Sequence, residues 1–355
     1  MGARDLDRDV VWAFIERMTG LVAGTTTVGL LAVADRTGML RSMAGAGPLT
    51  AERLAARTNL DERYVTEILS GLTAAEFILY DPEKAAFTLP DELAACIADD
   101  DSPYSMAGWM DVLPALLSHV PDIVDATRRG GGVAFRDFDD TVVRGIDRLN
   151  SASYKHLLIR KWLSALPDVA ARLEEGATVA DVGCGSGGAV IAMAEAYPAS
   201  RVIGYDLDER SIVRAMAKAS AAGCENTAFE VRSADEIPTE PGFDLITTFD
   251  VIHDLARPHE CLSRIRAALV PGGTYVMMEP RAAPDLEDNV GDRGALLYGV
   301  STLFCMTQSL ADGGPGLGMA WGPRRAESLC RQAGFASFEE VPIDNPFSAF
   351  YRAEA

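Results

Sequence analysis

The hydrophobic pattern divides the chain into a helical N-terminal part and a C-terminal part in which strands and helices alternate. In the first part, apolar residues recur at helical spacing, and turn signals separate the segments. This pattern predicts helices within residues 10–45, 51–58 and 61–76 and short strands at 77–80 and 87–89. A helix, a turn, a second helix and a hairpin, in this order, are typical of a winged helix. Residues 99–176 are predicted to be further helices, interrupted at Gly130–Gly132.

From residue 178 onward, short β-branched and apolar runs alternate with helical segments. They predict strands at 178–182, 201–206, 227–232, 243–249 and 273–278, and a last pair at 335–341 and 347–352. Alternation of this kind is typical of a parallel, doubly wound α/β sheet, here of seven strands and Rossmann-like. We therefore expect an all-α winged-helix domain (1–98), a helical connector that roofs the pocket (99–176) and a ligand-binding α/β domain (177–355). A ligand should lie beyond the carboxyl ends of the strands.

One glycine-rich stretch follows the first of these strands. Gly183, Gly185 and Gly188 satisfy the dinucleotide pattern G-x-G-x-x-G, so an NAD(P)-dependent oxidoreductase is one reading. Asp181 stands two residues before the first glycine. A pyrophosphate would meet this carboxylate at close range, whereas a ligand with an ammonium and a sulfonium group would be attracted by it. The charge therefore favours S-adenosylmethionine.

With an acidic residue, one spacer and alternating glycines, this stretch resembles the first motif of the class I S-adenosylmethionine-dependent methyltransferases. Leu269-Val270-Pro271-Gly272-Gly273, before the fifth strand, resembles them too. The expected cofactor contacts in the glycine stretch are Asp181, Gly183, Cys184, Gly185, Ser186 and Gly187. Further along the chain they are Asp206 at the ribose hydroxyls, Leu207 at the adenine face, Ala234 and Asp235 at the adenine edge, and Phe249. Asp206 also suits NAD, and it or Asp235 can instead cap a turn.

His253 and Asp254 follow the fourth strand and are the candidate catalytic residues. Of the four histidines, only His253 follows the carboxyl end of a strand beside the glycine stretch, and histidine titrates near neutral pH. The segment is similar to that of plant-type O-methyltransferases, in which a His followed by Asp carries the general base. The alternative is a histidine that only packs or caps a helix.

A third interpretation of His253 and Asp254 is that they bind a metal ion. Methyltransferases that act on the carbon of α-keto acids look similar here and hold iron with adjacent His and Asp plus a later His. No histidine follows His259, and Phe304 and Cys305 stand where the third ligand would be sought. We therefore expect no metal, with metal-assisted C-methylation of an α-keto acid kept as an alternative.

The segment from Cys305 to Leu310, the glycine-rich loop 313–318 and Trp321-Gly322 resemble bacterial winged-helix methyltransferases that act on small molecules. The resemblance implies a hydrophobic or aromatic acceptor. Four apolar side chains could face it: Tyr298, Phe304, Met306 and Trp321. A helix packed in a dimer interface would explain them equally well.

Charge and composition narrow the set of partners. The 355 residues include 52 acidic and 32 basic ones, a net charge of −20, which disfavours nucleic acid and anionic lipid. Residues 47–98 hold nine acidic and four basic side chains, so a ligand-responsive DNA-binding regulator is a weaker reading than dimerisation and substrate covering. The apolar helices of residues 10–40 predict a homodimer. Six scattered cysteines, no apolar run long enough for a membrane span and no signal peptide predict a cytoplasmic protein with reduced thiols.

Overall fold

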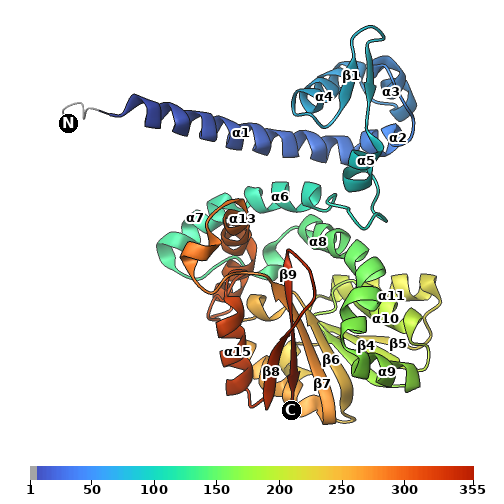
Figure 1. The fold of residues 1–355 in the computed structure, drawn as a ribbon, viewed down its shortest axis with the longest axis vertical. Helices are drawn as coiled ribbons and strands as arrows, with labels where there is room; N and C mark the ends of the chain where they lie inside the picture. The colour runs from blue at the N-terminus through green and yellow to red at the C-terminus, as the bar shows by residue number, and fades with distance from the viewer. Residues whose placement is uncertain (1–5) are drawn as a thin grey trace. The chain divides into compact units, whose positions relative to one another are not determined.

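The computed structural model describes residues 6–355, which form two compact units (Figure 1). The first unit holds the residues up to 114 together with 144–149. The second holds 115–143 and 150–355. The connector predicted from sequence thus contributes to both units.

The first unit contains the winged helix. Its elements are α1 (Arg8–Arg36), α2 (Met39–Met43), α3 (Ala51–Thr58), α4 (Glu62–Ala74), β1 (Leu79–Asp81), β2 (Ala86–Thr88) and α5 (Asp91–Ile97). Thr50 and Asp61 cap α3 and α4 by accepting hydrogen bonds from backbone N–H groups in their first turns. The predicted helix, turn, helix and hairpin are therefore confirmed, although the antiparallel hairpin means that the domain is not purely helical.

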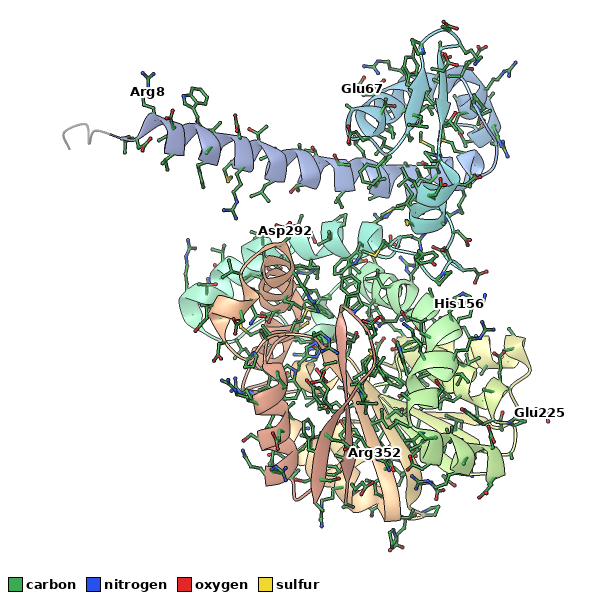
Figure 2. The ribbon with its side chains drawn as sticks, viewed as in Figure 1. Arg8, Glu67, His156, Glu225, Asp292 and Arg352 are labelled. Carbon is green, nitrogen blue, oxygen red and sulfur yellow. The ribbon has the colours of Figure 1, made fainter. Side chains whose placement is uncertain are left out.

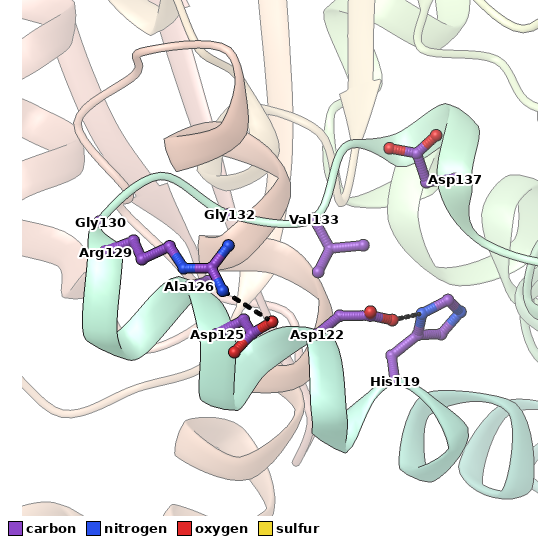
Figure 3. Close-up of a pocket in the computed structure, with 9 residues that line it drawn as sticks. All are labelled: His119, Asp122, Asp125, Ala126, Arg129, Gly130, Gly132, Val133 and Asp137. Atoms are coloured by element: carbon purple, nitrogen blue, oxygen red, sulfur yellow. Dashed lines mark hydrogen bonds and ion pairs between the residues drawn. The ribbon is translucent and has the colours of Figure 1, made fainter.

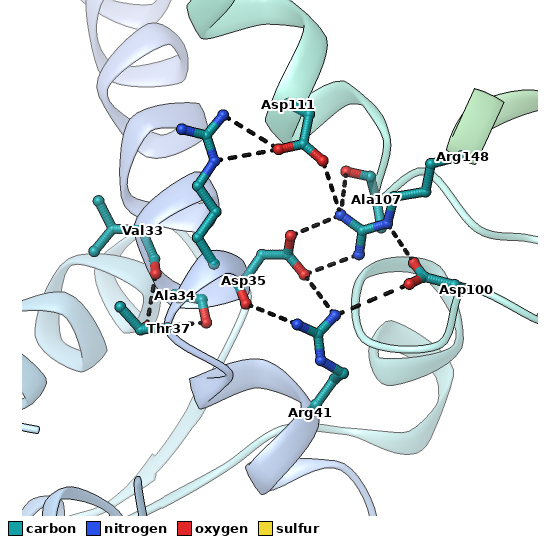
Figure 4. A network of polar contacts seen from close by, with 10 residues as sticks. Val33, Ala34, Asp35, Thr37, Arg41, Asp100, Ala107, Asp111 and Arg148 are labelled. Carbon is teal, nitrogen blue, oxygen red and sulfur yellow. Dashed lines mark hydrogen bonds and ion pairs between the residues drawn. The ribbon is translucent and has the colours of Figure 1, made fainter. Parts of the chain in front are cut away.

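Buried ion pairs join residues 144–149 to the first unit (Figure 4). Arg148, on α8 (Asp140–Ser153), donates two hydrogen bonds to the buried carboxylate of Asp35, at 2.7 and 2.9 Å. The same guanidinium contacts Asp111 at 3.2 Å, and Arg41 reaches Asp35 at 3.4 Å. A bidentate pair with further partners is the arrangement in which a buried carboxylate is tolerated.

The second unit is built on a seven-stranded sheet of order β5-β4-β3-β6-β7-β9-β8. Its strands are β3 (Thr178–Val182), β4 (Arg201–Asp206), β5 (Thr227–Val231), β6 (Phe243–Phe249), β7 (Leu269–Pro280), β8 (Ser337–Val341) and β9 (Ser348–Glu354). Parallel pairing runs from β5 to β7, whereas β9 pairs antiparallel with both β7 and β8. The sheet is therefore mixed, and the prediction of a parallel sheet is wrong for β9.

Helices cover both faces of this sheet (Figure 1). One face carries α9 (Pro167–Glu175), α10 (Gly188–Ala196) and α11 (Glu209–Ala222), and the other carries α12 (Pro258–Ala268) and α15 (Gly322–Gln332). From β3 the chain continues to β4 and β5 on one side of the sheet, and β6 then pairs with β3 on its other side. The topological switch point therefore lies between β3 and β6. Ligands of such sheets bind beyond the carboxyl ends of the strands at this point.

The remaining elements connect these layers. They are α6 (Trp109–Ser118), α7 (Val120–Arg129), η1 (Phe135–Asp137), the π-helix η2 (Tyr154–Trp162), η3 (Leu163–Ala165), η4 (Ala234–Glu236), η5 (Ile252–Asp254), η6 (Leu286–Asn289), α13 (Asp292–Val300), the π-helix η7 (Ser301–Cys305) and α14 (Met306–Ala311).

Within residues 6–355, two helical stretches are long and apolar enough to cross a membrane by length and composition alone, Arg8–Arg36 and Asp292–Ala311. This differs from the expectation that no stretch reaches that length. Half of the apolar window in Asp292–Ala311 is buried within the protein, as in the core helices of soluble proteins. In α1 the share is 22%, so its apolar surface is left largely exposed.

Candidate functional site

The glycine stretch forms a tight loop between β3 and α10. Gly183 has a φ of 74°, and a Cβ there would come within 2.5 Å of the Val251 side chain, so only glycine fits. Gly185 also has a positive φ, of 52°, and the space around it is open. Helix α10 begins at Gly188 without a side-chain cap, so its first N–H groups face the loop. The loop therefore offers both room and hydrogen-bond donors to a ligand.

Asp206 holds this loop from the neighbouring strand. It ends β4, and its two carboxylate oxygens accept hydrogen bonds from the backbone N–H groups of Gly185 and Asp208, both at 2.8 Å. Burial raises the pKa of Asp206, an effect that these backbone donors oppose. The structure thus places a carboxylate beside the glycine loop, where the sequence predicted a ribose contact.

Asp181 lies deeper, within the sheet. Its side chain is buried, and the Thr247 hydroxyl on β6 donates to it at 2.6 Å. Burial raises the pKa of this carboxyl to about 7, although the Thr247 hydrogen bond opposes the shift. A group with this pKa changes charge near neutral pH.

The other predicted cofactor residues fall into different surroundings. Cys184 and Ser186 are buried in the loop, and Leu207 is 70% exposed directly after Asp206. Asp235, on η4 with Ala234, forms a 2.6 Å ion pair with Arg257, which lowers the pKa of its carboxyl. Phe249 packs against the rings of Tyr154 and Trp162, with centroids 5.7 and 5.8 Å away. Leu207 thus extends the surface at the loop, whereas Phe249 belongs to the buried core below it.

His253 is buried in η5, just after β6, and a carboxylate holds its ring. Its Nδ1 lies 2.6 Å from Oε2 of Glu279 on β7, and Glu279 is itself buried. The second oxygen of Glu279 accepts from the Ile252 N–H at 2.9 Å, and Trp321 Nε1 donates to Oε2 at 3.2 Å. Glu279 therefore fixes the orientation of the imidazole ring.

The opposite ring nitrogen faces a second group of side chains. Nε2 of His253 lies 3.2 Å from Oδ1 of Asp254, and Cys305 of η7 is also in contact with both. Burial acts to lower the pKa of His253, but the carboxylates of Asp254 and Glu279 raise it well above its usual value. The same burial raises the pKa of Asp254.

Sequence reasoning missed two members of this site, Glu279 and Asp250. The acid that contacts Nδ1 is Glu279, and Trp321, expected only as an apolar side chain, also donates to Glu279. Cys305 lies beside His253 and Asp254, at the position where a third ligand was sought. Asp250, between β6 and η5, has a left-handed φ of 57°, and burial raises its pKa to about 7. Glu279 was predictable, because it ends the strand next to β6.

The other histidines lie elsewhere in the described chain. His119 bonds Asp122 at 2.9 Å, His259 is exposed on α12, and His156 lies on η2 (Figure 2). His119 also borders a pocket of about 410 Å³ on α7 and the loop after it (Figure 3). That pocket is lined mainly by ion-paired and acidic side chains: Asp122, Asp125, Arg129 and Asp137. It contains none of the predicted site residues.

Comparison with known protein families identifies the domains of this chain. Residues 173–315 match the family model described as "Methyltransferase domain". The chain therefore contains a methyltransferase domain. Residues 25–99 of this methyltransferase match the "Rv2258c-like winged HTH domain". The domain match also favours methyl transfer over the NAD(P)-dependent alternative. No curated protein matches the chain.

Solved structures share the fold over nearly the whole methyltransferase. A putative O-methyltransferase from Nostoc punctiforme is 17% identical, with a TM-score of 0.72 over 99% of this chain and 100% of its own. Human N-acetylserotonin methyltransferase in complex with SAM is 17% identical, with a TM-score of 0.72 over all of both chains. An O-methyltransferase from neocarzinostatin biosynthesis, in complex with S-adenosylhomocysteine and 1,4-dihydroxy-2-naphthoic acid, is 21% identical, with a TM-score of 0.64 over 93% and 96%.

S-adenosylmethionine is the cofactor of this methyltransferase, and the residues present fit it. The open space at Gly185 gives it room, and the uncapped start of α10 gives it donors. Asp206 lies at the loop, and Asp181 adds a second carboxylate to the same end of the sheet.

Proposed function

We propose that this methyltransferase acts on a small hydrophobic or aromatic acceptor and that His253 is its general base. The observation that carries the proposal is the His253–Glu279 pair at the carboxyl end of β6 and β7. Strand β6 adjoins β3, which carries the glycine loop, so the imidazole and the cofactor loop share one end of the sheet.

Each residue has one role in this proposal. The bound cofactor supplies an electrophilic methyl group on sulfur. Asp206 and the glycine loop bind its nucleoside, and Asp181 attracts its positive charge. With Nδ1–H donating to Glu279, Nε2 of His253 accepts the proton of the acceptor. Holding the nucleophile in line with the methyl carbon contributes the larger share of the rate.

Cofactor affinity should depend on the charge of Asp181. Because burial raises its pKa to about 7, the carboxyl is neutral below that pH and its attraction for the cofactor is lost. We expect the affinity for S-adenosylhomocysteine to fall about tenfold between pH 8 and pH 6. Asp181→Asn should weaken binding at pH 8 and flatten this dependence. Titration calorimetry measures both, and an unchanged slope in Asp181→Asn would show that another group is responsible.

The proposal of a hydrophobic or aromatic acceptor rests on apolar side chains that follow η5 in the chain. Met306 is partly buried and Tyr298 is 39% exposed, whereas Phe304 packs at 4.9 Å from the Phe138 ring. Tyr298 and Met306 therefore remain candidates for contact with the acceptor, and Phe304 supports them. The neocarzinostatin enzyme, whose structure contains a dihydroxynaphthoic acid, offers a precedent for an aromatic acceptor on this fold.

An untargeted labelling experiment can find the acceptor. Incubating the protein with a metabolite extract and methyl-labelled cofactor should transfer label to a small organic product. His253→Ala, run in parallel, should abolish most of that product. Label that enters only protein or nucleic acid would contradict a small-molecule acceptor.

The winged helix is proposed to mediate assembly and substrate covering rather than DNA binding. In a DNA-binding winged helix, α4 would enter the major groove of the DNA. Here Arg63 of α4 forms an ion pair with Glu67 (Figure 2). Glu62 stands at the start of the same helix. A helix with this balance repels phosphates.

A homodimer is proposed because α1 exposes a long apolar surface. Residues 8–26 are all exposed, and Trp12, Phe14 and Leu21 have 59%, 60% and 58% of their surface open. Large exposed apolar patches mark interfaces. The wild type should therefore elute at twice the mass of one chain, and Trp12→Asp with Phe14→Asp should elute as a monomer. Light scattering measures the masses, with Arg8→Asp as a control at an exposed polar position. A monomeric wild type at micromolar concentration would contradict the proposal.

A further inference from the structure

Three side chains with metal-binding atoms meet at the Nε2 edge of the His253 ring. One ligand atom each from His253, Asp254 and Cys305 lies within 4.8 Å of the other two. Two of these residues belong to η5, and Cys305 ends the π-helix η7. A π-helical turn within a helix is rare and recurs at functional sites. An imidazole, a carboxylate and a thiolate together suit a borderline-soft divalent ion such as Zn²⁺.

The surroundings of His253 match those of a metal-binding histidine. Glu279 holds Nδ1 at 2.6 Å, so with the proton on Nδ1 the lone pair of Nε2 is directed toward Asp254 and Cys305. Glu279 is itself fixed by the Ile252 N–H and the Trp321 indole. Carboxylate–histidine pairs of this kind orient metal ligands and raise their basicity.

The carboxylate of Asp254 is the central acceptor of this cluster. Its buried Oδ1 faces Nε2 of His253 at 3.2 Å, and with the ring proton on Nδ1 neither atom donates to the other. Gln308, which is 8% exposed, and Cys305 lie close enough to this carboxyl to lower its pKa as hydrogen-bond donors. Two acceptor atoms that face each other in a buried site are unfavourable unless a cation or a proton lies between them, and a metal ion would contact both.

We propose that His253, Asp254 and Cys305 form an inhibitory site for a divalent transition metal, with Zn²⁺ as its natural occupant. Binding forms bonds from the ion to Nε2, a carboxylate oxygen and Sγ, and the thiol proton of Cys305 is released to solvent. Three protein ligands leave a fourth position for water. An ion on Nε2 occupies the lone pair that would take the acceptor's proton. The inhibition rests on the proposed role of His253, whereas the binding does not.

Cobalt spectroscopy tests the binding directly. Co²⁺ added to the metal-free protein should give the near-ultraviolet charge-transfer band of a cobalt–thiolate bond, and Zn²⁺ should displace it. Cys305→Ser should remove the band, and Glu279→Gln should weaken Co²⁺ binding by about 10–100-fold. Cys261→Ser is the matched control, because Cys261 is equally buried on α12 and should leave the band unchanged. No band in the wild type, or a band that survives Cys305→Ser, would overturn the proposal.

Inhibition separates this proposal from the role of His253 as a base. Methyl transfer by the wild type should fall with added Zn²⁺, and in Cys305→Ser, compared with its own metal-free rate, the same concentration should inhibit far less. If His253→Ala keeps full activity while the cobalt band depends on Cys305, the base is wrong and the metal site stands. If His253→Ala is inactive and no cobalt band forms, the metal site is wrong and the base stands.

Discussion

His253→Ala should lower the turnover number for methyl transfer by about 10²–10⁴-fold. Affinity for S-adenosylhomocysteine should stay within a few-fold, because His253 is not among the residues proposed to bind the cofactor. The reason is geometric, since Glu279 orients the ring so that Nε2 is free to take a proton at the cofactor end of the sheet. Initial rates with labelled cofactor give the first quantity, and calorimetry gives the second.

His259→Ala provides the matched control, since His259 is exposed on α12 and bears on no proposed step. It should retain the wild-type rate. Full activity in His253→Ala would make the buried histidine a structural residue. A loss of cofactor affinity equal to the loss of rate would point to a collapsed site instead.

Glu279→Gln should move the pH dependence of methyl transfer toward acid. A base must be neutral to accept a proton, and the carboxylates of Glu279 and Asp254 raise the pKa of His253 well above its usual value. The wild-type rate should therefore rise with pH through this raised pKa. Removing one negative charge lowers the pKa of His253, so the rising limb should shift by about 1–3 pH units toward acid. Rates measured from pH 6 to pH 10 at saturating cofactor give the shift.

The maximal rate of Glu279→Gln should also fall, because the amide holds the imidazole less firmly in the required tautomer. Glu340→Gln makes the same substitution at an exposed residue of β8 and should leave the profile unchanged. An unshifted limb in Glu279→Gln would mean that the titration belongs to another group.

The sequence predicted most elements of the fold because their signals are local. The bounds of β3, β4 and β6 match the predicted runs, since each is a short β-branched stretch between turn residues. Strand direction is not encoded in such a run, which is why the strand at 347–352 was predicted but its antiparallel direction was not. Strand β7 begins at Leu269, earlier than predicted, because Leu269 already pairs with Phe243 of β6, before a register shift after which pairing resumes at Thr274.

The site was only partly predictable for a related reason. Asp206 ends a strand and His253 stands shortly after one, so their position at the carboxyl end of the sheet could be inferred from nearby residues. Glu279 and Cys305 lie far along the chain from His253 and reach it only through strand pairing and helix packing. A single sequence gives candidates for such contacts, for example the acid near the end of the next strand, but only the folded protein shows which of them reach the imidazole.

Calorimetry with S-adenosylhomocysteine and with NADH is the most direct test of the central claim. The account predicts that S-adenosylhomocysteine binds tightly, that Asp206→Ala weakens this binding, and that NADH does not compete. Tight binding of NADH without binding of S-adenosylhomocysteine would contradict it.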